Sequence, residues 1–167
     1  KADQVIATAQ KEWLSTEKSM IADDAHARVV MDGQFYSSTL SLSQLGFNLP
    51  QGATILGIKV NLEGRRQGNG TLKEYSVRLV SGNAVSSNMA GKGYNAMNVW
   101  AKNVSDKKWS YGYADHLWGI NWSAAMINDP SFGLQIQLIN FSTQSVEALL
   151  DGATIEVTYL PLATFCL

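Results

Sequence analysis

The chain has 167 residues, of which 46% are hydrophobic and only 16% are charged. Its length suits one domain with a full core, so we expect a single domain over residues 1–167. The 13 Lys and Arg face 14 Asp and Glu, which excludes the basic surface that nucleic-acid binding requires. No apolar run of about 18 residues occurs, so we expect no membrane insertion.

The low charged fraction also bears on location. Globular domains usually carry about 25% charged residues. Here Ser, Asn, Gln, Thr and Gly take their place. Surfaces of this kind are common on extracellular and virion β proteins, so we expect an extracellular, cell-surface or virion location.

The N-terminal stretch leaves its secondary structure open. Residues 2–14 carry Val5, Ala9 and Trp13 at helical spacing, yet Val5-Ile6 also suits a strand. From there on, alternation of apolar and polar residues predicts strands. The first two runs are residues 25–31 and residues 40–42.

The clearest predicted unit is a β-hairpin. Residues 53–63 alternate, residues 65–70 end in Asn-Gly and predict a turn, and residues 72–80 return. In the return strand Tyr75, Val77 and Leu79 are expected to point inward, with Glu74, Ser76 and Arg78 outward.

Further alternation predicts strands over residues 132–138 and 154–159, and residues 122–128 predict a short helix capped by Asn121 or Ser123. Runs with one apolar and one polar face are typical of antiparallel sheets. We therefore expect an all-β fold, an antiparallel, jelly-roll-like sandwich of two sheets with at most one or two short helices.

A series of short motifs follows a recognisable order along the chain. Trp13, Asp23-Asp24 and residues 40–47 come first. They are followed by Pro50-x-Gly-Ala-Thr-Ile-x-Gly-Ile58-x-Val60, Trp118-Gly119-x-x-Trp122, Phe132-Gly133 and Asp151-x-x-x-Ile155-x-Val157-x-Tyr159. Over residues 13–160 this order resembles β-sandwich modules of phage virion proteins and bacterial surface proteins. The resemblance implies a structural or adhesive role and carries over no catalytic residue.

Aromatic residues gather in the segment from Tyr94 to Trp122. Trp118 and Trp122 are interpreted as core or capping residues, because Gly119 lets the backbone approach closely. A second group could stack on sugar rings and form a glycan-binding platform. Its members are Trp100, Trp109, Tyr111 and Tyr113.

Motifs of catalysis and of metal binding are missing from the sequence. There is no Gly-x-Ser-x-Gly elbow, no phosphate-binding loop and no repeated His or Cys spacing, so we expect neither an enzyme nor a transition-metal site. Asp23 and Asp24 are weak candidates for a calcium site, with a turn before a strand as the alternative. No cofactor is otherwise expected.

The C-terminal residues 161–167 are mostly apolar and uncharged, which predicts docking on the sandwich or on a neighbouring subunit. The residues predicted to make assembly contacts are Pro161, Leu162, Phe165 and Leu167. Strand edges are the other expected contact. The sequence thus predicts a self-associating structural module of a filament or virion, with a carbohydrate-binding or adhesin module as the alternative.

Overall fold

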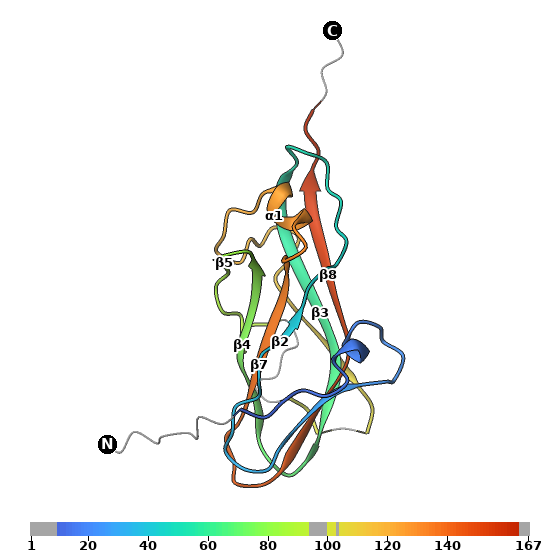
Figure 1. Cartoon of the computed structure of the whole chain (residues 1–167), viewed down its shortest axis with the longest axis vertical. Helices are drawn as coiled ribbons and strands as arrows, with labels where there is room; N and C mark the ends of the chain where they lie inside the picture. The colour runs from blue at the N-terminus through green and yellow to red at the C-terminus, as the bar shows by residue number, and fades with distance from the viewer. Residues whose placement is uncertain (1–9, 94–99, 103, 164–167) are drawn as a thin grey trace, which may run out of the picture.

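The computed structural model describes residues 10–93, 100–102 and 104–163 and is an all-β sandwich. Two four-stranded antiparallel sheets pack together, with one short α-helix at one end (Figure 1). The predicted fold class is confirmed. Most of the strands bury alternate side chains, and each sheet covers the apolar face of the other.

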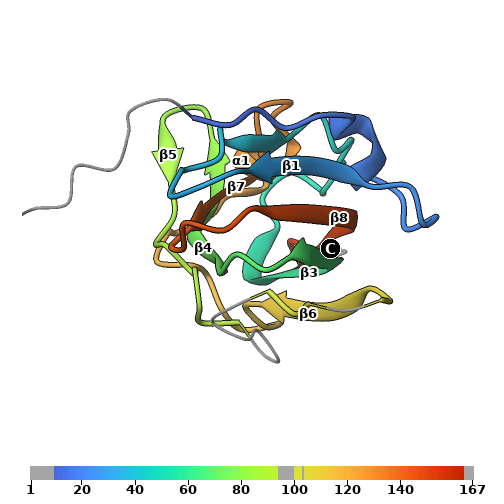
Figure 2. The same cartoon turned by 90° about the horizontal axis from the view of Figure 1, so that it is seen from below.

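The first sheet has its two longest strands at the centre. β3 and β8 have 15 residues each and pair from Thr54 opposite Leu160 to Gly68 opposite Val146. Shorter strands flank them in the order β1, β8, β3, β6 (Figure 2). The strands of this sheet are β1 (Ala27–Met31), β3 (Thr54–Gly68), β6 (Lys107–Tyr111) and β8 (Val146–Leu160).

The second sheet has the order β2, β7, β4, β5. Its central strand β7 buries Leu134, Ile136 and Leu138, with Gln135 and Gln137 between them, as the alternation predicts. The strands of this sheet are β2 (Leu40–Leu42), β4 (Leu72–Ser81), β5 (Ala84–Val85) and β7 (Gly133–Asn140).

Successive strands cross between the sheets, as in a jelly roll, and only β4 and β5 follow each other within one sheet. The predicted hairpin is therefore wrong. β3 continues to Gly68 and pairs with β6 and β8, while β4 pairs with β5 and β7. Alternation identifies a strand and the face that it buries. It does not identify the sheet, because the same face is buried when the strand belongs to the opposite sheet.

A β-bulge in β4 overturns the predicted direction of Tyr75. Pairing with β7 skips from Glu74 to Ser76, which leaves Tyr75 without a partner in the ladder. Tyr75 is 51% exposed, whereas Val77 and Leu79 are buried as predicted. The extra residue shifts the alternation, so that Glu74 shares a face with buried residues instead of facing solvent.

The short α-helix fits the predicted signals. Helix α1 (Ala124–Asn128) is capped by Ser123, whose Oγ accepts a hydrogen bond from Met126 N at 3.2 Å. A 3-10 helix, η1 (Thr16–Ser19), precedes β1. Residues 10–14 are extended and bridge β1 through Leu14 and Arg28, so the described end of the ambiguous stretch is not helical.

The buried side chains form one cluster between the sheets. Trp118 is fully buried, and its Nε1 donates to Ile58 O at 2.8 Å, which ties the chain after β6 to β3. Trp122 is also buried and donates to Leu117 O. Their interpretation as core residues is confirmed. None of the helices within the described residues has the length and apolarity to cross a membrane.

Candidate functional site

The four rings of the predicted glycan platform do not form one exposed surface. Tyr111 has no exposed surface, Trp100 is 4% exposed, and Trp109 is partly buried against the core. Only Tyr113 is largely exposed, at 52%. A flat stacking surface needs several accessible rings, and three of these four are buried or partly buried.

Three of the four rings, those of Trp100, Trp109 and Tyr111, instead surround a carboxyl group. Trp100 packs edge-on against Trp109 with ring centroids 5.0 Å apart, and Trp109 Nε1 donates to the Tyr111 hydroxyl at 2.8 Å. The Tyr111 hydroxyl donates to Glu74, whose other oxygen accepts from Gly91 N at 2.9 Å. The aromatic segment and the bulge of β4 thus build a polar network inside the sandwich.

Burial governs the chemistry of this network. Desolvation raises the pKa of Glu74, against the lowering effect of the hydrogen bonds that it accepts. Burial and the nearby Glu74 carboxyl raise the pKa of Tyr111. Sequence reasoning missed Glu74, because regular alternation places it on the solvent face and only the bulge turns it inward.

The predicted calcium candidates fall near an acidic cluster. Carboxylate oxygens of Asp24, Asp106 and Asp151 lie within 4.8 Å of one another. Asp106 is already paired, at 2.8 Å from Arg65 Nη1 and 3.0 Å from His26 Nε2. A guanidinium this close offsets the negative charge that a cation would need.

Asp23 has a structural role beside this cluster. Its Oδ1 accepts from Ala25 N at 3.1 Å, and its own N–H donates to Asp151 Oδ1 at 3.1 Å. This is the turn before a strand that the sequence offers as the alternative to a metal ligand.

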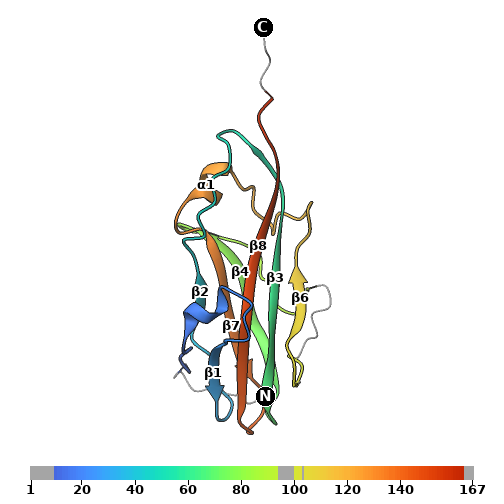
Figure 3. The same cartoon turned by 90° about the vertical axis from the view of Figure 1, so that its right-hand side faces the viewer.

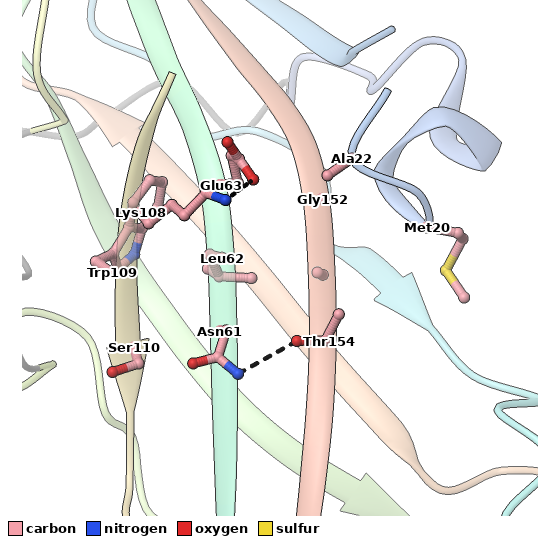
Figure 4. A pocket seen from close by; sticks show the side chains of 11 residues that line it. Met20, Ala22, Asn61, Leu62, Glu63, Lys108, Trp109, Ser110, Gly152 and Thr154 are labelled. Atoms are coloured by element: carbon pink, nitrogen blue, oxygen red, sulfur yellow. Dashed lines mark hydrogen bonds and ion pairs between the residues drawn. The ribbon is translucent and has the colours of Figure 1, made fainter. Parts of the chain in front are cut away.

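A shallow hollow of about 410 Å³ lies on the outer face of the first sheet, between β6 and the loop after η1 (Figure 4). Polar side chains on its floor pair with each other: Asn61 with Thr154 at 3.2 Å, and Lys108 with Glu63 at 3.2 Å. These groups already satisfy one another, and nothing in the hollow indicates a particular ligand.

Loops cover most of the sides of the longer strands where the shorter flanking strands end. Backbone hydrogen bonds from these loops continue the ladders of β3, β4 and β7, and one further pair covers part of the outer edge of β1. The pairs that make these bonds are Leu14–Arg28, Ile58–His116 and Arg66–Ala101 in the first sheet, and Met89–Val77, Ser37–Leu138 and Asn140–Phe35 in the second.

One side of β8 is the exception. β1 covers β8 from Val146 to Leu150, and Met20 bridges Gly152. Beyond that bridge, no described residue makes a backbone hydrogen bond to the outer side of residues 154–160. In Figure 3 this part of β8 extends well past β1. We call residues 154–160 the free edge.

The free edge lacks the features that keep other edges from pairing. β2 and β5 have 3 and 2 residues, and the outer strand β6 carries Lys107 and Lys108. Short strands and lysines are common devices against edge-to-edge association. The free edge is longer than any of these strands, and Glu156 is its one charged residue.

The predicted assembly residues of the C-terminal segment continue directly from this edge. Leu160 and Leu162 are 57% and 68% exposed, and Pro161 lies between them. Phe165 and Leu167 lie outside the described residues. The part of the segment that the structure describes therefore presents apolar side chains to solvent.

Comparison with protein-family models, with curated proteins and with solved structures finds no match for this chain. The resemblance to β-sandwich modules of phage virion and bacterial surface proteins stays a prediction.

Proposed function

We propose that this chain is a non-enzymatic structural module of an extracellular filament or virion, such as a fibre, decoration or surface protein, and that it self-associates. The observation that carries the proposal is the free edge of β8. An uncovered strand presents N–H and C=O groups that pair readily with another chain. Strand addition of this kind is a recurring mode of recognition.

Two further features support assembly. Leu160 and Leu162 extend the free edge with exposed apolar side chains, which lose contact with water when a neighbour covers them. The chain carries few charges that would oppose close approach, with a net charge of −1. Neighbouring structural subunits are therefore the partners that this surface fits.

Light scattering over a concentration series, together with electron microscopy, tests the proposal. We expect a mass above the 18.2 kDa of one chain, or visible polymers, at high protein concentration. A chain that stays monomeric at every concentration would contradict self-association. Deletion of residues 161–167 should weaken association. Unchanged assembly would mean that this segment makes no contact between subunits, and it would leave the free edge as the contact.

A further inference from the structure

We propose that the free edge of β8 pairs antiparallel with the same edge of a second copy, about a two-fold axis at Val157. This inference rests on the proposed self-association and specifies its surface, symmetry and register. The resulting interface is isologous, since each copy presents the same residues to the other.

The hydrogen bonds of β3 show which β8 groups point outward. Ile58 N donates to His116 O, and Ile58 O accepts from Trp118, so both backbone groups of Ile58 point away from β8. Ile58 lies opposite Val157 in the antiparallel ladder. In such a pair both residues point their backbone groups away from each other, so those of Val157 point to the free edge.

Alternation along β8 extends this to its neighbours. Ile155 and Tyr159 lie two residues on either side of Val157, so their N–H and C=O groups also point to the free edge. Each of these three residues can exchange two hydrogen bonds with a residue of a facing strand.

Backbone pairing along the free edge is blocked at both of its ends. At one end Met20 already bridges Gly152. At the other, Pro161 has no N–H to donate and stops a ladder. With the axis at Val157, Pro161 of each copy falls opposite Ala153 of the other, beside the Met20 bridge. The two stops therefore coincide, and residues 154–160 of both copies can pair.

Charge selects this register over the next one. A two-fold axis perpendicular to the sheet places side chains of the same sheet face opposite each other. This holds for an axis at Val157 and also for an axis one residue along, at Glu156. An axis at Glu156 places two carboxylates directly opposite each other, which is destabilising. An axis at Val157 places Glu156 opposite Thr158, and Ile155 opposite Tyr159, a favourable aromatic and β-branched pair.

The first test removes the outward N–H at the axis. Val157→Pro deletes a donor that no described group of the same chain accepts, and proline is tolerated on a strand whose N–H faces solvent. Val157→Thr is the matched control, because it keeps the N–H and the β-branched shape. We expect Val157→Pro to raise the dissociation constant at least about tenfold by sedimentation, and Val157→Thr to change it far less.

The second test reads the register directly and does not depend on how Val157→Pro folds. In a Cys166→Ser background, Glu156→Cys combined with Thr158→Cys should form an interchain disulfide on mild oxidation. Residues opposite each other in a pair without mutual hydrogen bonds lie about 4.5 Å apart at Cα, within the disulfide range. The single variant Glu156→Cys should form little disulfide. If the axis instead lay at Glu156, this single variant would form the disulfide efficiently.

The outcomes separate this inference from the proposed function. A chain that self-associates, but tolerates Val157→Pro in a folded protein and gives no disulfide, assembles through another surface, and the inference is overturned. Efficient linkage through Glu156→Cys alone overturns the register. A chain that never associates overturns the proposed function together with the inference.

Discussion

At the scale of single residues, Glu74 shows how a bulge places a carboxyl group in an aromatic cluster. Its oxygens accept from Tyr111 and Gly91, and the indoles of Trp100 and Trp109 lie alongside. None of the described residues forms an ion pair with Glu74, and burial raises its pKa because the charged form loses its hydration. This network joins β4, β6 and the loop before β6.

The raised pKa of Glu74 predicts the direction in which stability changes with pH. In the folded chain Glu74 binds a proton more tightly than in the unfolded chain, so its contribution is fully present below the ordinary pKa of 4.5 and is lost as the pH rises through the raised pKa. Glu74→Gln should remove this loss. Urea unfolding at several pH values measures it as the difference between the two proteins.

The control for this measurement is Glu63→Gln, on the outer face beside Lys108. A surface ion pair of this kind contributes about 0–1 kcal/mol. The pH profile of Glu63→Gln should therefore follow that of the natural chain. If Glu74→Gln also follows it, burial of Glu74 does not cause the loss of stability at rising pH.

At the scale of elements, β2 and β7 approach each other closely because Gly133 has no side chain. A Cβ at this position would overlap the carbonyl oxygen of Leu42. Backbone atoms of a paired strand cannot yield as a flexible side chain can. This close approach gives a structural reason for the glycine in the Phe132-Gly133 motif.

Gly133→Ala is therefore expected to lower the free energy of unfolding by about 3 kcal/mol. Gly82→Ala is the comparison, because a Cβ there meets no atom within 4 Å and the cost comes only from a φ of 54°. That backbone strain is worth about 1–2 kcal/mol. Chemical denaturation of both variants measures the difference, and equal losses would show that β2 moves aside.

At the scale of the whole molecule, pairing of two copies would join their first sheets into one continuous sheet. β1 and β6 would lie outside the new contact. Association that occurs only in the folded state stabilises that state by mass action. Assembly and stability are thereby linked.

The melting temperature should consequently rise with protein concentration, and Val157→Pro should weaken that rise. Differential scanning calorimetry across a hundredfold range of concentration measures both. A melting temperature that does not change over this range, in a chain shown to associate, would mean that the associated form unfolds as readily as the monomer.

Local pattern in the sequence was enough for the fold class. Alternation at residues 25–31, 53–63 and 132–138 marks strands because a sandwich solvates one side of each sheet. The sequence also predicted a helix cap at Asn121 or Ser123 and the burial of Trp118 and Trp122, since a cap and a close glycine approach act over a few residues.

The tertiary structure alone decided how these strands are used. Segments distant in the chain decide which sheet β4 joins and which side of β8 stays uncovered. They also decide where the bulge turns Glu74 inward and Tyr75 outward. A strand signals the face it buries through its own side chains. Its hydrogen-bonding partners are set by backbone groups that are alike in every residue but proline, so the sequence does not name them.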